Sequence, residues 1–147
     1  MRNTLLIIAF ACLVASCGGT QTETNPLDNY FAIKDALVAT DAVKAQEAAS
    51  TFIASTDNPV FTAALEKIAN TTDVKAQRAA FDALSESMYA FVKSKSISSE
   101  QPIYKQYCPM AFNNEGAFWL SAQKEVRNPY FGDMMLTCGS VQETLNQ

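Results

Sequence analysis

A chain of 147 residues, 48% of them hydrophobic, is long enough to form one domain with its own core. It carries 11 basic and 15 acidic residues, and this mildly acidic balance lacks the basic surface that a nucleic-acid-binding protein needs. It contains no histidine, which excludes Ser-His and Cys-His nucleophile pairs and the common zinc enzyme sites. We therefore predict that the protein is not an enzyme.

The N-terminal segment has the pattern of a bacterial lipoprotein leader. Arg2 precedes an apolar run, residues 5–14, which is too short to span a bilayer and is typical of a signal peptide. Val14-Ala15-Ser16-Cys17 resembles a lipobox, in which a peptidase cleaves just before a lipidated cysteine. We predict a signal peptide over 1–16 and a flexible polar tether over 17–25.

Acylation of Cys17 would anchor the protein in membrane lipid. The predicted location is the bacterial cell envelope, facing the periplasm or exposed at the surface. The alternative is ordinary cleavage nearby, which would leave Cys17 as a passive thiol.

Four stretches after the leader carry apolar residues at helical spacing. The first starts at Pro26 behind the cap Asn25, the second behind Asp41, the third after the turn Asp57-Asn58-Pro59 and the fourth at Asp73. The fourth is the longest, with an apolar stripe of Val74, Phe81, Leu84, Met88, Tyr89, Phe91 and Val92. The predicted fold is mostly α: an antiparallel four-helix bundle of two αα-hairpins, within a single helical domain over 26–147.

One short motif occurs twice in the helical region. Residues 40–46 read Thr-Asp-Ala-Val-Lys-Ala-Gln, and residues 72–77 read Thr-Asp-Val-Lys-Ala-Gln. Each copy opens the second helix of a predicted hairpin. A shared need for an aspartate cap and an alanine-rich packing face explains the similarity, and one short match does not establish a duplication.

Residues 103–145 have a different character and are predicted to form an irregular, aromatic-rich cap with room for short strands. Alternation over 103–107 predicts a short extended segment, and 113–116 a turn. Residues 117–120 form a buried apolar run, and 139–145 are predicted to close the chain with a brief helical turn.

Four motifs in the cap carry a resemblance to a known family. They are Cys108-Pro109-Met110-Ala111, Trp119-Leu120-Ser121, Asn128-Pro129-Tyr130-Phe131-Gly132 and Met135-Leu136-Thr137-Cys138-Gly139. Together they resemble the bacterial domain of unknown function 3347, with a specific match in the C-terminal half and a weaker one in the helices. Members are small exported proteins or appendages on the adaptor subunits of copper and silver efflux pumps. The resemblance therefore implies a heavy-metal context and an efflux adaptor as a partner.

The sulfur atoms of the cap support two interpretations. In an exported protein, Cys108 and Cys138 are natural disulfide partners, and the bridge would close the cap. Alternatively, Cys108 and Met110 on one turn and Met135 and Cys138 on another form a soft donor set, which selects Cu(I) and also admits Ag(I). The resemblance favours Met135 over its neighbour Met134, because Met135 occupies the methionine position of the family.

The predicted function is an envelope lipoprotein that binds or buffers a soft heavy metal, copper above all, as an accessory to metal efflux or homeostasis. The alternative is a non-enzymatic structural or interaction module in which a Cys108–Cys138 disulfide staples the cap. No residue pattern indicates a catalytic site.

Overall fold

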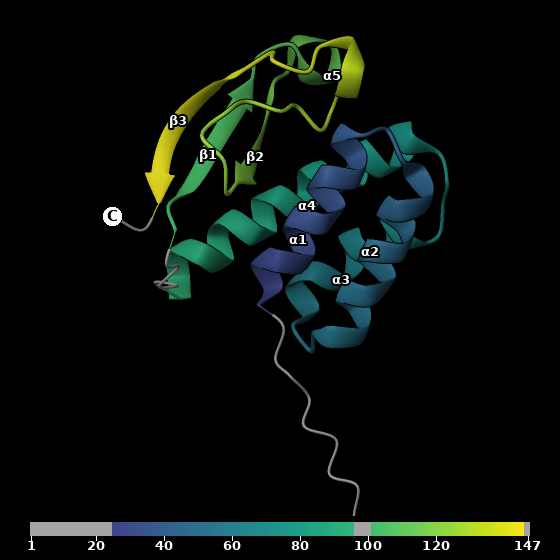
Figure 1. Cartoon of the computed structure of the whole chain (residues 1–147). Helices are drawn as coiled ribbons and strands as arrows, with labels where there is room; N and C mark the ends of the chain where they lie inside the picture. Colours follow the sequence, from purple (N-terminus) through teal and green to yellow (C-terminus); the bar gives the residue numbers. More distant parts are fainter. Residues whose placement is uncertain (1–24, 96–100, 146–147) are drawn as a thin grey trace, which may run out of the picture.

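The N-terminal half of the molecule folds into four long helices. The computed structural model describes residues 25–95 and 101–145, so the predicted signal peptide, Cys17 and all of the tether except residue 25 lie outside the described residues. The helices are α1 (Pro26–Val38), α2 (Ala42–Ser55), α3 (Pro59–Ala69) and α4 (Val74–Lys95). Each packs against the next, and α1 also contacts α4 (Figure 1). Within the described ranges, no helix has the length and apolarity required to cross a membrane.

Polar side chains stop or start the helices where the sequence predicts. Asn25 accepts a hydrogen bond from the Leu27 N–H at 3.1 Å, and Pro26 stands in the first turn of α1. Asp41 accepts from the Lys44 N–H at 3.0 Å, which starts α2. These bonds satisfy backbone donors that a helix leaves unpaired, and they confirm the predicted boundaries.

The repeated motif has a structural explanation beyond capping. Its two copies end in Gln46 and Gln77, and each glutamine amide reaches the other hairpin. Gln46 Nε2 donates to the Ala69 carbonyl at 2.7 Å. Gln77 Nε2 donates to the carbonyls of Ala42 and Thr71, both at 2.8 Å. The two copies therefore fix the helical pairs to each other.

The core of the helical layer follows the predicted stripe of α4. Phe81, Leu84 and Met88 are fully buried. The Phe81 ring stacks on Tyr30 of α1, with ring centroids 5.0 Å apart, and tilts against Tyr130 of the cap at 6.0 Å. Phe81 therefore contacts both the helices and the cap.

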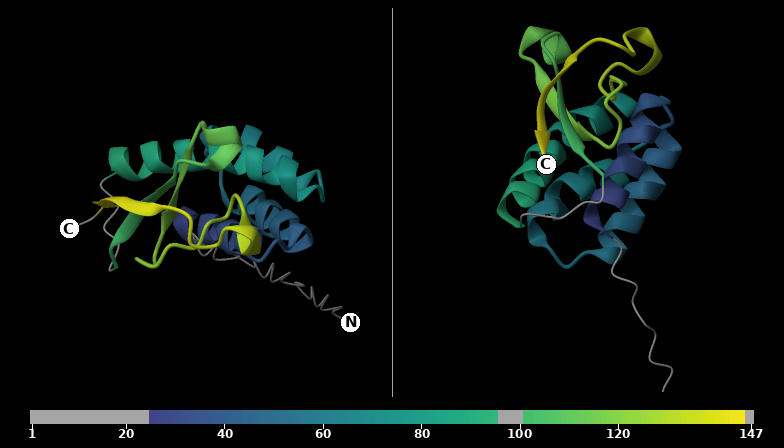
Figure 2. Two further views of the ribbon diagram at one scale, coloured as in Figure 1. Left: turned by 90° about the horizontal axis from the view of Figure 1, so that it is seen from above. Right: turned by 60° about the vertical axis from the view of Figure 1, so that its left-hand side comes forward.

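The cap is a three-stranded antiparallel sheet rather than an irregular structure. Its strands are β1 (Ile103–Cys108), β2 (Ala117–Ser121) and β3 (Ser140–Leu145), in the order β2-β1-β3. Figure 2 shows the sheet lying over the helices, with β3 at its outer edge. The prediction of a helical turn over 139–145 is wrong. Pairing with β1 imposes an extended conformation on that segment. The segments between the strands contain α5 (Ala111–Asn114) and a 3-10 turn, η1 (Gly132–Met134).

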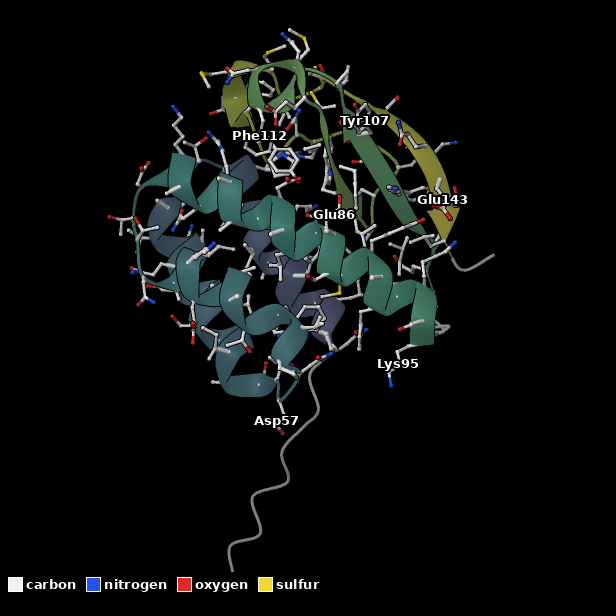
Figure 3. All side chains as sticks on the ribbon, turned by 180° about the vertical axis from the view of Figure 1, so that it is seen from behind. Asp57, Glu86, Lys95, Tyr107, Phe112 and Glu143 are labelled. Carbon is white, nitrogen blue, oxygen red and sulfur yellow. The ribbon has the colours of Figure 1, made fainter. Side chains whose placement is uncertain are left out.

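A cluster of charged and aromatic residues fastens the sheet to α4. Lys105 of β1 places its amine 4.2 Å from the ring centroids of both Tyr89 and Phe118. The Tyr89 hydroxyl donates to Glu143 of β3 at 2.7 Å, and Lys93 contacts the same carboxylate at 2.9 Å. These hydrogen bonds lower the pKa of Glu143. Figure 3 shows Glu143 on the outer strand.

Arg78 joins the other end of α4 to the cap. Its side chain is buried, and its Nε donates to the Pro129 carbonyl at 2.8 Å. Its Nη2 donates to the Leu37 carbonyl and to the Thr40 hydroxyl, both at 3.1 Å. Burial lowers the pKa of Arg78, yet no carboxylate is needed because neutral acceptors surround the guanidinium. One side chain thus connects α1, α4 and the segment between β2 and β3.

Candidate functional site

The fold brings the two cysteines of the cap into contact. Cys108, the last residue of β1, is fully buried, whereas Cys138 is half-buried and lies just before β3. Their Sγ atoms are 3.1 Å apart, and both are free thiols. A disulfide bond is about 2.05 Å long, so the thiols are in hydrogen-bond contact without a covalent bond. The disulfide that the sequence offered as an alternative is therefore absent, and this prediction is wrong.

Asn128 holds the segment that carries Cys138. Its buried side chain donates from Nδ2 to the Cys138 carbonyl at 2.9 Å and accepts from the Tyr130 N–H at 2.8 Å. Its own N–H donates to the Leu136 carbonyl at 2.7 Å. Asn128, in one of the four motifs that carry the family resemblance, thus fixes the position of Cys138 opposite Cys108.

Gly139, directly after Cys138, allows the segment to pass close to β1. Its φ is +139°, in the region that favours glycine. A Cβ atom at this position would lie 2.8 Å from the Tyr107 carbonyl oxygen and 3.2 Å from Cη2 of Trp119. The indole ring of Trp119 therefore lies against the backbone next to Cys138.

We expect Gly139→Ala to destabilise the cap and to separate the two thiols. The added methyl group meets a backbone oxygen and a strained φ, which together should cost about 1–3 kcal/mol of unfolding free energy. Denaturant unfolding measures this cost, and faster reaction of Cys108 with a thiol reagent measures the separation. Ser140→Ala, at an exposed neighbouring position, is the matched control. Equal stability of the two variants would contradict the close approach.

The turn after Cys108 is left-handed. Phe112, Asn113 and Asn114 have φ values of 50°, 58° and 71°, and the Gly116 N–H closes the turn on the Ala111 carbonyl at 3.0 Å. This conformation is costly for phenylalanine, but the Phe112 ring packs edge-on against Tyr130 at 5.2 Å, and Figure 3 shows it between α5 and α4. The sequence predicted a turn here, and the ring contact explains its conformation.

The methionines lie beside the thiols in the chain but differ in exposure. Met110 is 46% exposed and Met134 is 76% exposed, whereas Met135 is half-buried. The Met135 carbonyl accepts the Cys138 N–H at 3.1 Å, which holds the two residues in one turn. Among the described residues, no group of three or more His, Cys, Asp or Glu side chains could hold a metal ion. Any metal at this site would depend on the two thiols and on thioethers.

The contact between the thiols affects the pKa of Cys138. The hydrogen bond with Cys108 raises the pKa of Cys138, and burial and the charge of an ionised Cys108 raise it further. Cys138 is therefore protonated at neutral pH, and a protonated thiol is a weak nucleophile. Such a pair becomes a strong donor set only when a ligand displaces the protons.

Gln106 is a supporting residue that the sequence did not indicate. It lies two positions before Cys108 in β1 and is fully buried. Its Nε2 donates to the carbonyls of Gln123, Lys124 and Glu125 at 3.0, 3.1 and 3.2 Å. It thereby holds the start of the β2–β3 connection over the sheet. The alternation of residues along β1 could have indicated that the Gln106 side chain points into the protein. No local sequence pattern, however, indicates hydrogen-bond partners so far away in the chain.

Comparison with known proteins gives one match. A family model described as "protein of unknown function (DUF3347)" matches residues 27–100, half of the chain. This range covers the four long helices except for Pro26, the first residue of α1, and it ends before β1, so the family match lies on the helical half. The cap motifs between Cys108 and Gly139, which carry the resemblance to the family, lie outside the matched range. No curated protein and no solved structure matches the chain.

Proposed function

The chain belongs to the DUF3347 family, and we propose that this member is an envelope-anchored lipoprotein that binds or buffers Cu(I) or Ag(I) through Cys108 and Cys138. We propose further that it acts as an accessory to metal efflux or homeostasis, with an efflux adaptor protein as its partner. The single observation that supports binding is the 3.1 Å contact between two free thiols in a site without histidine.

The chemistry of the donors favours a soft monovalent ion. Thiolates and thioethers select Cu(I), whereas Mg²⁺ and Ca²⁺ require oxygen ligands that the thiol pair does not offer. With a metal–sulfur distance of about 2.3 Å, two thiolates on one ion can be no more than about 4.6 Å apart. The two sulfur atoms would therefore separate by at most about 1.5 Å from their 3.1 Å contact.

Met110 and Met135 are the proposed thioether ligands. Each is within three residues of one of the cysteines, and the Met135–Cys138 turn is closed by a hydrogen bond. One or both thioethers would complete the coordination that two thiolates begin. Their contribution would be smaller than that of the thiolates, because a neutral sulfur attracts a cation less strongly than an ionised one.

Anaerobic titration of the reduced protein with Cu(I) tests the proposal. We expect tight, stoichiometric binding that Cys108→Ser and Cys138→Ser abolish. Met110→Leu and Met135→Leu should weaken binding while changing stability by less than about 1.5 kcal/mol. Met88→Leu, which removes a buried thioether from α4, is the matched control and should leave affinity unchanged. Failure of the reduced wild type to compete with a mild Cu(I) chelator would contradict metal binding and favour a structural or interaction module.

The affinity for Cu(I) measured in this titration should depend on pH. Because the pKa of Cys138 is raised, binding must displace a thiol proton at neutral pH. Affinity should therefore increase with pH until the pH exceeds that raised pKa, and it should level off above it.

The membrane anchor is tested separately. Because residues 14–17 resemble a lipobox, we expect Cys17→Ser to release the protein from the membrane fraction. Immunoblots of fractionated cells measure the distribution. A serine variant that fractionates with membranes like the wild type would rule out the lipid anchor.

A further inference from the structure

Met134 has an exposure that packing does not explain. Its side chain is 76% exposed, the largest value among the large hydrophobic side chains of residues 25–95 and 101–145. Methionine side chains normally fill core gaps, and this one contributes little to any core. Its thioether is instead available to solutes.

The turn that carries Met134 is held firmly against the helices. The Gly132 N–H donates to the Asn128 carbonyl at 3.0 Å, and the Met135 N–H donates to the Gly132 carbonyl at 3.3 Å. Gly132 lies so close to α4 that a Cβ atom there would be 2.8 Å from Nη2 of Arg78. Met134 is therefore presented to solvent by a fixed backbone.

The two cysteines differ in their exposure to solvent. Cys108 is fully buried at the end of a paired strand, and an ion from solution cannot reach it directly. Cys138 is half-buried and belongs to the same connection as Met134, four residues further along the chain. The three sulfur-containing residues thus differ in exposure: Met134 is exposed, Cys138 is half-buried and Cys108 is fully buried.

We infer that soft metal ions enter and leave along this connection: Met134 takes the ion from a small thiol or thioether carrier and passes it to Cys138, after which Cys108 retains it. This inference rests on the metal-binding function proposed above. Each step is a ligand exchange in which one metal–sulfur bond forms as another breaks. The ion stays monovalent, and the thiol protons pass to solvent as the thiolates bind.

A residue that the ion contacts only on its way to the site changes the rate constants of binding differently from a ligand of the final site. A residue that the ion contacts only in transit lowers the barrier for entry and exit equally. Its removal slows association and dissociation by the same factor and leaves the dissociation constant unchanged. Removal of a ligand of the final site instead weakens the affinity.

Stopped-flow mixing of the reduced protein with Ag(I) delivered as a thioether complex separates these cases. Trp119, the single tryptophan, lies against Gly139 beside Cys138, so its fluorescence reports occupancy of the thiol pair. The variant is Met134→Leu, a nearly isosteric change at an exposed position. The matched control is the double variant Met134→Leu/Val43→Met, which moves an exposed thioether to α2, where Val43 is 55% exposed.

The inference predicts that Met134→Leu slows association and dissociation severalfold at unchanged affinity, and that the double variant stays equally slow. Unchanged rates in Met134→Leu would overturn it, and so would recovery of the rates in the double variant. A lower affinity of Met134→Leu would make Met134 a ligand of the final site and would also overturn the inference. In all three cases the wild type still binds Ag(I), whereas absence of binding by the wild type would contradict the proposed function itself.

Discussion

Phe81→Ala is expected to lower the free energy of unfolding by about 3–5 kcal/mol, the largest effect of any single substitution considered. Phe81 is fully buried, and its ring contacts Tyr30 and Tyr130, whose centroids are 5.0 and 6.0 Å away. Truncation removes apolar surface from the interior and leaves a cavity between the helices and the sheet, which rigid neighbours cannot fill. Denaturant unfolding at equilibrium measures the loss.

Lys75, on the same helix and exposed to solvent, provides the control. Substitution of Lys75 by alanine should change stability by no more than about 0.5 kcal/mol. If the two variants lost equal stability, the face of α4 that packs against the cap would have been assigned incorrectly.

Arg78→Met is expected to cost about 2–3 kcal/mol, because it removes charged hydrogen bonds while keeping most of the apolar stem. The carbonyls of Leu37 and Pro129 and the Thr40 hydroxyl would lose a donor at 2.8–3.1 Å. Pro129 adjoins Asn128, which holds Cys138, so the loss should extend to the thiol pair. Thermal unfolding measures stability, and alkylation of Cys138 measures the loosening of the segment.

Arg78→Lys is the informative companion variant. Lysine keeps the charge, but its single amine cannot reach three acceptors in the fork geometry of a guanidinium. The lysine variant should therefore recover only part of the lost stability. Full recovery would mean that charge alone matters at this position, and the proposed link between α1, α4 and the cap would be wrong.

The helices could be predicted from the sequence because their determinants are local. A cap residue, a proline in the first turn and an apolar stripe lie within a few positions of one another, as at Asn25, Pro26 and Leu27. The sheet could not be predicted with the same success. Residues 140–145 form a strand because β1 pairs with them, and that pairing depends on residues far away in the chain.

The pairing of the two cysteines at the candidate site could be predicted from the sequence, whereas the residues that support the pair could not. The contact between Cys108 and Cys138 was expected, since both interpretations of the sequence required it. The spacing of the cysteines in the sequence does not indicate whether they form a disulfide or remain free thiols. The support from Asn128 and Gln106 was missed because their partners are backbone carbonyls, which leave no signature in a single sequence.

The sequence separation of the contacts has a consequence for the order of folding. The helices pack mainly on their neighbours in the chain, whereas the Leu120 N–H reaches the Tyr30 hydroxyl across a separation of 90 residues. Closing long loops is slow, since their entropy is lost before distant contacts compensate for it. The helical layer can therefore assemble first and serve as a template for the sheet. In that order of folding, Cys108 and Cys138 would come into contact only when the sheet docks on the helices, and each thiol would be open to chemical modification until that step.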